Sequence, residues 1–370
     1  MDRRLRLRLL PFVVLLVAGA CGRPSEMDFL QARADALATS HPPGGVILAI
    51  IEPDGKVIAA SAGRQSGGDP IPIDGRVRIG SVTKTFVAVL VLQLVDDGKV
   101  DLDAPARSYV TNSPLPPDVT VRDLLQHTSG LPGDAQPGFL ARIQGQPEKP
   151  RTPKEILAFS HDVPPLFEPG TSWSYSNTNY IYLGLLIERV TGMPVARVLR
   201  TRIIQPLGLE DTYLAGAEEG PPVIRAPVRI GDREFPYDYP YTSIVTSAWT
   251  AGAMVSSAAD VGTFFNALFA GRLISRSALR EMRTIAPGSE ADDPPSGYGL
   301  GLTEWHPSEY PGVRLYGHGG GISSFVTLAF HDPLSGVTYF AAGTDLGMDF
   351  KPTMLEMIGF INGADGRVPE

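Results

Sequence analysis

The spacing of apolar and polar residues predicts strands near both ends of the chain. Close to the start, Met27 to Ala38 has the spacing of a helix, and Val46 to Ile51 is a strongly apolar strand. Val57 to Ala62 follows across the turn Pro53-Asp54-Gly55, which makes the two apolar segments a hairpin. The N-terminal part is therefore expected to supply one helix and a pair of antiparallel strands.

Strand patterns return near the C-terminus. The short apolar or alternating runs there are Tyr298 to Thr303, Arg314 to Tyr316, Phe325 to Phe330 and Val337 to Ala342. A turn at 332–336 joins the last two, and Lys351 to Ile361 is a closing helix. Because strands from both ends enclose a helical middle, we expect an α/β (α+β) fold. Its single antiparallel sheet is assembled from the two chain ends and flanked by helices.

The middle of the chain has helical periodicity and long loops, with little strand pattern. The expected helices are Val121 to Gln126, Pro153 to Ser160, Asn179 to Thr191, Pro194 to Ile204 and Ala259 to Ala270. We expect loops at 133–152 and over most of 215–245. The length of 370 residues suits two domains. The predicted division is a sheet domain of residues 26–100 plus 260–365, with an inserted, mainly helical domain of residues 101–259.

The run Ser81 to Asp97 is apolar nearly all round, so it predicts a helix that is buried on most sides. Lys84 lies three residues after Ser81, which puts the two side chains on one helical face, one turn apart. Two interpretations are open. Ser81 caps the helix and Lys84 is an incidental cation, or Lys84 is a buried amine that loses its proton readily and acts as a base toward the Ser81 hydroxyl.

The first 20 residues have the layout of a secretory signal peptide. Four arginines precede the short apolar run Leu9 to Ala18, and Ala18-Gly19-Ala20-Cys21 follows. Two processing routes fit this segment: ordinary cleavage after a small-x-small site, or lipidation of Cys21 as in a bacterial lipoprotein. We favour the lipid anchor, because Cys21 is the only cysteine and an exported protein with a lone thiol needs a reason for it. The protein is therefore predicted to be exported, as a membrane-anchored lipoprotein or in secreted form.

The charge balance argues against nucleic acid as a partner. The whole chain carries −8, and the first 20 residues contain four Arg and one Asp, so the remainder carries −11. An acidic exported protein is a poor candidate for binding nucleic acid. With 43% hydrophobic and 19% charged residues, the composition is that of an ordinary globular protein with an ample core.

Two further segments carry chemistry-bearing residues. Tyr175-Ser176-Asn177 is the only Tyr-x-Asn in the chain; alone, it is favoured as a helix start with Ser176 or Asn177 as the cap. His318 stands among four glycines, in Tyr316-Gly317-His318-Gly319-Gly320-Gly321 at the end of an expected strand. Glycines let another backbone approach closely, so this segment is either a glycine-rich strand end with a surface histidine or part of a binding site.

Together, S-x-x-K, Y-x-N and H-x-G in this order resemble the serine β-lactamase and penicillin-binding protein superfamily, closest to the D-alanyl-D-alanine carboxypeptidases and class C β-lactamases. The resemblance runs from about residue 28 to 345. The supporting stretches are Leu124 to Leu131 (LLQHTSGL), Pro169 to Asn177, Pro206-Leu207-Gly208-Leu209 and Gly297 to Leu302 (GYGLGL).

The resemblance implies a role for each motif residue. Ser81 is the acylated nucleophile, and Lys84 takes part in its deprotonation. Tyr175 is the general base toward Ser81 and the general acid toward the leaving group. Which of Lys84 and Tyr175 holds the proton first stays open, because the pair titrates as a unit. Asn177 orients Lys84 and the acyl amide. His318 stands where other members carry Lys and supplies a donor and a tunable charge beside Tyr175.

The resemblance also implies the surroundings of the reacting bond. The backbone N–H groups of Ser81 and Gly321 form the oxyanion hole, and removing one such donor typically costs ~10²–10³ in rate. Gly319 and Gly320 contact the substrate. Trp249 is a candidate wall of the substrate pocket, with a core position as the equal alternative.

Two positions depart from the carboxypeptidase-like members. The middle of the third motif is Gly319 where those members usually have Thr, and Thr303-Glu304-Trp305 stands where they can carry an Arg. Those groups help to bind the terminal carboxylate of the substrate, and losing charged hydrogen bonds of this kind costs roughly 1.5–3 kcal/mol each.

We therefore expect a serine hydrolase that works through an acyl-enzyme, without a metal or organic cofactor. The chain has no H-E-x-x-H metal pattern and no G-x-S-x-G nucleophile elbow. The first expected substrate is a D-Ala-D-Ala-type peptide of the cell wall, with peptidoglycan as the partner. The alternatives in the same fold are an ester or D-amino-acid amide, favoured by the missing carboxylate contacts, and a β-lactam. The competing class is a non-catalytic penicillin-binding-like protein.

Overall fold

The computed structural model of the chain describes residues 24–110, 114–133, 138–160, 163–292 and 295–364. The predicted signal peptide, residues 1–20, and the predicted lipidation site Cys21 lie outside these ranges. Among the helices in the described ranges, none combines the length and the apolar character that crossing a membrane requires.

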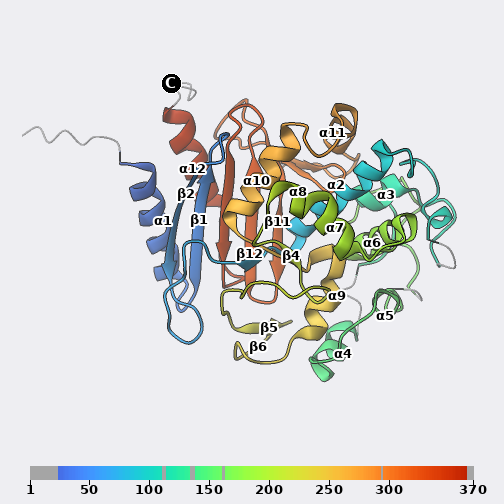
Figure 1. The fold of residues 1–370 in the computed structure, drawn as a ribbon, viewed down its shortest axis with the longest axis horizontal. Coiled ribbons are helices and arrows are strands. Elements are labelled where there is room, and N and C mark those ends of the chain that lie inside the picture. The colour runs from blue at the N-terminus through green and yellow to red at the C-terminus, as the bar shows by residue number, and fades with distance from the viewer. Residues whose placement is uncertain (1–23, 111–113, 134–137, 161–162, 293–294, 365–370) are drawn as a thin grey trace, which may run out of the picture.

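One antiparallel sheet runs through the molecule, as Figure 1 shows. In the described residues it has eight strands, in the order β2-β1-β13-β12-β11-β10-β9-β8. Starting at the β2 edge of the sheet, the strands are β2 (Val57–Gly63), β1 (Gly45–Ile51), β13 (Thr338–Gly343), β12 (Phe325–His331), β11 (Leu315–Ile322), β10 (Thr303–Trp305), β9 (Pro295–Tyr298) and β8 (Ala291–Asp292). β1 pairs with β13, with Val46 opposite Gly343, so strands from the two ends of the chain meet as the second and third strands of the sheet. The predicted sheet built from both chain ends is confirmed.

Helices cover both faces of the sheet, which explains why β1 is apolar at every position. Val46, Leu48 and Ile50 share a core with α1 and α12, while the residues between them share a core with α2 and α10. In Figure 1 the first pair of helices lies on one side of the sheet and the second pair on the other. The covering helices are α1 (Glu26–Ser40), α12 (Lys351–Ala364), α2 (Thr83–Asp96), α10 (Ala258–Phe269) and α11 (Arg276–Met282).

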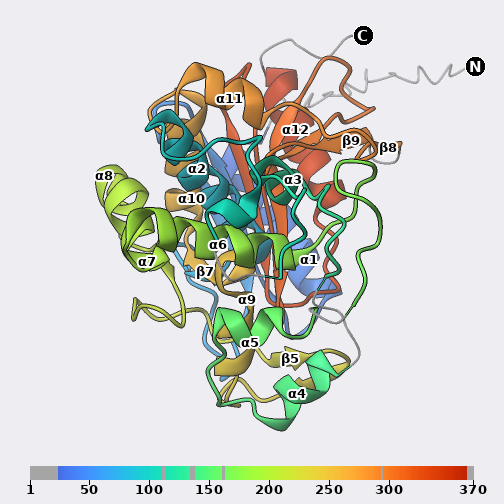
Figure 2. The same ribbon diagram turned by 90° about the vertical axis from the view of Figure 1, so that its right-hand side faces the viewer.

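Most of the remaining helices belong to the middle of the chain. They are α3 (Val121–Gln126), α4 (Phe139–Gly145), α5 (Pro153–Leu157), α6 (Asn177–Thr191), α7 (Val195–Leu199), α8 (Gln205–Leu207) and α9 (Thr242–Gly252), with a π-helical turn at Arg200–Ile204 and 3₁₀ turns at Gly80–Val82 and Ala106–Ser108. Two small sheets accompany them: β3 (Val77–Arg78), β7 (Met254–Ser256) and β4 (Tyr213–Leu214) form one, and β5 (Val228–Ile230) and β6 (Arg233–Phe235) form a hairpin. Figure 2 shows α4, α5 and this hairpin gathered at one end of the molecule. The division into two domains stays a prediction.

Three segments differ from the sequence-based expectation. The expected loop at 133–152 contains α4, whose Phe139 and Ile143 are buried one turn apart. The expected loop at 215–245 contains the β5–β6 hairpin and the start of α9, a helix that buries small polar residues such as Ser243 and Thr250 and therefore lacks a clear apolar stripe. The helix α11 was not expected.

The segment predicted as one strand from Tyr298 to Thr303 is a turn between two strands. β9 ends at Tyr298 and β10 begins at Thr303. Gly299 N–H donates to the Leu302 carbonyl, and Gly301 has a φ of 68°, which favours glycine. The two strands pair with each other, with Tyr298 opposite Thr303, so this turn brings Tyr298 beside β11.

Candidate active site

Ser81 lies in a 3₁₀ turn just before α2, and Lys84 lies in the first turn of that helix. The N-cap of α2 is Val82, so the interpretation of Ser81 as a simple helix cap is wrong. Lys84 Nζ is instead 3.0 Å from Ser81 Oγ. The Lys84 side chain is fully buried, at 0% exposure, so its charged form pays a desolvation cost that its neutral form does not.

Lys84 Nζ also contacts two carbonyl-type oxygens from distant parts of the chain. It lies 2.7 Å from Asn177 Oδ1, on α6, and 2.7 Å from the backbone oxygen of Ala251, on α9. Both oxygens only accept, whereas a serine hydroxyl can also donate. An uncharged Lys84 amine can therefore donate to these two oxygens and accept the Ser81 proton with its lone pair. This arrangement suits a general base.

The position of the Ala251 carbonyl depends on a kink in α9. Trp249 has φ 33° and ψ −122°, a conformation outside the helical region that costs on the order of 1–3 kcal/mol. Two residues later the chain presents the Ala251 oxygen to Lys84. The Trp249 ring lies against Gly184 of α6, where an added Cβ would come within 2.6 Å of it. Its predicted contact with substrate stays a prediction.

Tyr175 lies beside this pair, just before α6. Its side chain is 38% exposed, so a ligand can reach it. Lys84 Nζ is 4.8 Å from the centroid of its ring. Asn177 is the first residue of α6, and Ser176, one of the two expected caps, is the N-cap residue. The Ser176 Oγ makes no capping bond to the helix and donates to the Pro132 carbonyl. The Tyr-x-Asn and Ser-x-x-K segments, predicted to act together, therefore meet at Lys84.

His318 lies on β11, with its ring centroid 6.2 Å from that of Tyr175. Its Nδ1 contacts the Gly319 carbonyl, which can only accept, so Nδ1 carries the proton. Its Nε2 then accepts from the Tyr298 hydroxyl at 2.9 Å. Burial lowers the pKa of His318 to about 3, and Lys84 adds to this effect whenever it is protonated. His318 is therefore neutral near pH 7, so the tunable charge expected there operates only in strong acid.

The two segments of the expected oxyanion hole are in direct backbone contact. A Cβ added at Gly320 would lie 2.9 Å from Ser81 N, and one added at Gly80 would lie 2.5 Å from Gly321 N. Glycine is the residue that fits at both positions, which explains why the third motif is rich in glycine. The backbone N–H groups of Ser81 and Gly321 belong to these adjoining segments.

A cavity of about 400 Å³ opens beside Ser81, Asn177 and Gly321. Most of its other walls are apolar, and they come from α4, the β5–β6 hairpin and α9: Phe139, Ile143, Ile230 and Ile244. Among the described residues that line it, Arg229 carries the only charge. This cavity suits a bulky, largely apolar group.

A second cavity of about 350 Å³ lies on the Tyr175 side. It is lined by Trp173, Tyr175, Tyr298, Thr303, His318 and Gly319, together with small residues of the segment 289–297. Since His318 is neutral near pH 7, no described residue in this lining carries a charge there. Tyr175 thus borders one cavity, and Ser81 and Asn177 border the other. Elsewhere in the described ranges, no group of three His, Cys, Asp or Glu side chains is arranged to hold a metal ion.

Sequence reasoning missed two contributors to this geometry. The Ala251 carbonyl gives no sequence signal, because every residue carries one. His127 is fully buried, at 0% exposure, and its ring centroid lies 4.4 Å from that of Tyr175. The sequence signal for His127 is the stretch Leu124 to Leu131, one of the stretches that carry the family resemblance.

We predict that stability falls in mild acid, because three histidines are buried in neutral form. Burial lowers the pKa of His127 well below 6.5, that of His318 to about 3 and that of His331 to about 4. In the unfolded chain each titrates near 6.5, so below that pH the unfolded state binds more protons. The free energy of unfolding should be highest above pH 6.5 and fall as the pH drops toward 4.

Urea unfolding between pH 8 and 4 measures this effect. His331 lies opposite Tyr316, whereas Gly321, beside Ser81, lies opposite Val326 near the other end of the same two strands. His331→Asn therefore isolates one of the three groups. This variant should reduce the slope between pH 6 and 5 by about 1.4 kcal/mol per pH unit at most. A free energy of unfolding that stays constant down to pH 4.5 would contradict the buried neutral histidines.

Comparison with known proteins agrees with this arrangement. The family model described as Beta-lactamase matches residues 30–351. Penicillin-binding protein 4 of Amycolatopsis lactamdurans is 29% identical, over 94% of this chain and 93% of its own length. The unguisins hydrolase ungD' of Aspergillus campestris is 26% identical over 90% of this chain, which spans 64% of that protein. A crystal structure of a D-stereospecific amidohydrolase from Streptomyces sp. superposes with a TM-score of 0.77, at 32% identity, covering 90% of this chain and 98% of the other.

Proposed function

The chain belongs to the β-lactamase family of serine β-lactamases and penicillin-binding proteins, and we propose that it hydrolyses amides or esters through an acyl-enzyme on Ser81. The proposed substrates are D-amino-acid derivatives with an apolar acyl part and an uncharged leaving group. The observation that carries this choice is the absence of any charged residue from the described lining of the cavity beside Tyr175 near pH 7.

In the proposed first step, neutral Lys84 takes the Ser81 proton while Ser81 Oγ attacks the substrate carbonyl. The 3.0 Å contact between Lys84 Nζ and Ser81 Oγ supports this transfer. Negative charge develops on the carbonyl oxygen, and the N–H groups of Ser81 and Gly321 are the proposed donors to it. As the intermediate collapses, the bond to the leaving group breaks and the Ser81 ester forms.

The proton then reaches the leaving group through Tyr175. In the second step a water molecule attacks the ester and gives a proton to Lys84, and Lys84 returns a proton to Ser81 Oγ as the acid leaves. One water is consumed for each bond cleaved. The position of Lys84 Nζ, 4.8 Å from the Tyr175 ring centroid, supports treating the two as one proton-transfer unit.

The two cavities divide the substrate between them. Tyr175 protonates the leaving group, so the cavity that it borders takes the leaving group, and the larger cavity beside Asn177 takes the acyl part. Burying an apolar side chain in the larger cavity is worth about 1.5–3 kcal/mol, which is about 10- to 150-fold in kcat/KM. The D-configuration comes from the similarity to the Streptomyces amidohydrolase.

A pair of substrates with the same acyl group tests the choice of leaving group. We expect N-acetyl-D-phenylalanine amide to be cleaved with a kcat/KM at least about 10-fold higher than N-acetyl-D-phenylalanyl-D-alanine, which ends in a carboxylate. The reason is that an unpaired carboxylate loses charged hydrogen bonds worth roughly 1.5–3 kcal/mol each. The measurement is the ratio of the two kcat/KM values.

Thr303→Arg should shift that ratio toward the carboxylate substrate by about 10-fold, because Thr303 lines the leaving-group cavity. Thr303→Gln is the matched control of similar length without charge. If the wild-type protein prefers the substrate that ends in carboxylate, the carboxypeptidase expectation replaces the amidase proposal. If the protein turns over none of these compounds, including benzylpenicillin and an aryl ester, that result would support a non-catalytic binding protein.

Export is part of the proposal. The basic and apolar layout of residues 1–20 supports removal of a signal peptide, and Ala18-Gly19-Ala20-Cys21 supports a lipid anchor on Cys21. An enzyme anchored in this way works outside the cytoplasm, beside the peptidoglycan.

A further inference from the structure

His127 plays no part in the proposed reaction, yet it contacts the chain on both sides of Tyr175. The Ser174 N–H donates to the His127 carbonyl at 3.0 Å, and the Ser176 N–H donates to His127 Nδ1 at 3.2 Å. Between these two bonds, the Tyr175 ring lies against the imidazole with centroids 4.4 Å apart. His127 therefore contacts both the backbone on either side of Tyr175 and the Tyr175 ring.

The hydrogen bonds define which nitrogen of His127 carries its proton. A backbone N–H can only donate, so Nδ1 is the acceptor and the proton is on Nε2. Asn179 Nδ2 lies 3.0 Å from the same Nδ1, and its amide is oriented by a bond from Ser129 Oγ to its Oδ1 at 2.6 Å. Protonating Nδ1 would break both accepted bonds. Burial adds a separate reason for the neutral ring, because a fully buried site disfavours the charged form.

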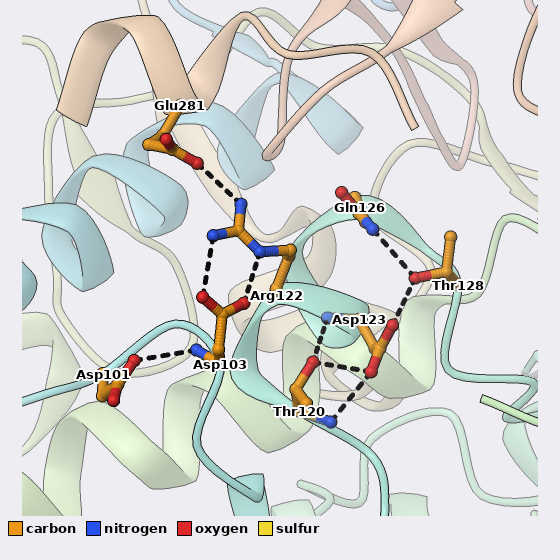
Figure 3. Close-up of polar contacts among 8 residues, drawn as sticks. All are labelled: Asp101, Asp103, Thr120, Arg122, Asp123, Gln126, Thr128 and Glu281. Carbon is orange, nitrogen blue, oxygen red and sulfur yellow. Dashed lines mark hydrogen bonds and ion pairs between the residues drawn. The ribbon is translucent and has the colours of Figure 1, made fainter. Parts of the chain in front are cut away.

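His127 is itself held on a rigid support. It is the C-cap residue of α3, with φ 66°, and Figure 3 shows how the polar groups around this helix are joined. Asp123 accepts from the Thr120 hydroxyl and backbone N–H at the start of α3, and from Thr128 Oγ1 just after the end of α3 at 2.6 Å. The carboxylate thus ties the two ends of the helix together, so His127 has little freedom to move.

We propose that His127 is a positioning residue, which holds Tyr175 at the angle needed to pass a proton from Lys84 to the leaving group. This inference rests on the proposed function, in which Tyr175 is the general acid. A misplaced general acid slows only those reactions in which the leaving group must be protonated. A misfolded site would slow all of them.

Two substrates with the same acyl group separate these cases. The p-nitrophenyl ester expels a stable phenolate without protonation, whereas the anilide expels an amine that must be protonated. His127→Phe keeps an aromatic ring beside Tyr175 but removes the Nδ1 acceptor. We expect its kcat to fall about 10²-fold with the anilide and less than about 5-fold with the ester, with KM changed less than about 3-fold. His127→Gln, which offers an amide oxygen to Ser176 N–H, should recover about 10-fold of the anilide rate.

Tyr175→Phe is the reference variant, and it should show the same loss with the anilide. Equal losses with ester and anilide in the His127 variants, or no loss with either, would overturn the proposal. If thermal unfolding shows that His127→Phe is not folded, His127→Gln is compared with wild type instead. The quantity compared is again the loss of kcat with the anilide relative to the loss with the ester. Failure of the proposed function looks different, since Tyr175→Phe itself would then not discriminate between the two substrates.

Discussion

Replacing Ser81 by alanine is expected to lower kcat by a factor on the order of 10⁶, because the variant has no atom that can accept the acyl group. The structure gives the hydroxyl a base at 3.0 Å, in Lys84, and a cavity of about 400 Å³ for the acyl part. The measurement is steady-state hydrolysis of an aryl ester, with the burst of product as a count of active sites. Both the burst and the turnover should disappear.

Ser247→Ala is the matched control for this experiment. Ser247 lines the same cavity, and its Oγ is buried without a hydrogen-bond partner among the described residues. Removing that hydroxyl should change kcat by less than about 10-fold, in keeping with a group that takes no part in the reaction. A Ser81→Ala protein that keeps more than a tenth of the wild-type rate would contradict the assignment of the nucleophile.

Lys84→Arg is expected to lower kcat by about 10³–10⁴-fold, close to the effect of Lys84→Ala. Arginine keeps the positive charge and the donors but cannot lose its proton, so it cannot serve as a base. The buried position of Lys84, with Asn177 Oδ1 and the Ala251 oxygen each at 2.7 Å, is suited to an amine that alternates between two protonation states. The measurement is kcat with the ester and the amide substrate.

Stability must be measured beside activity for these Lys84 variants. Lys84→Ala leaves two buried oxygens without this donor, which is expected to cost about 1–3 kcal/mol for each oxygen that stays unpaired. Urea unfolding separates that loss from the loss of the base. If Lys84→Arg folds and keeps full activity, Lys84 is a fixed cation and the proton-transfer scheme is wrong.

The fold was predictable wherever local pattern and burial agree. β1 is apolar throughout because both of its faces are covered, and Val121 to Gln126 is a helix with a capping box at Thr120 and Asp123, as its sequence indicates. The pattern was misleading where tertiary contacts decide. α9 has few long apolar side chains, and the apolar run from Tyr298 to Thr303 is broken by a turn at Gly299 and Gly301.

The site residues that belong to short sequence motifs could be predicted from the sequence. The three-residue spacing of Ser81 and Lys84 brings their side chains together within one helical turn. The sequence could not indicate which distant groups complete the environment of Lys84, because Asn177 and Ala251 are 93 and 167 residues away. Nor could it give the protonation of His318, which depends on burial and on the Tyr298 hydroxyl.

The central claim is that Ser81 carries the acyl group, and trapping that intermediate tests it most directly. The purified protein is mixed with an aryl ester, quenched in acid within the burst phase and examined by intact-mass and peptide-mapping mass spectrometry, with Ser81→Ala in parallel. The account predicts one acyl group per chain, on the peptide that contains Ser81, and none on the variant. An acyl group on any other residue, or rapid turnover with no acylated protein, would contradict it.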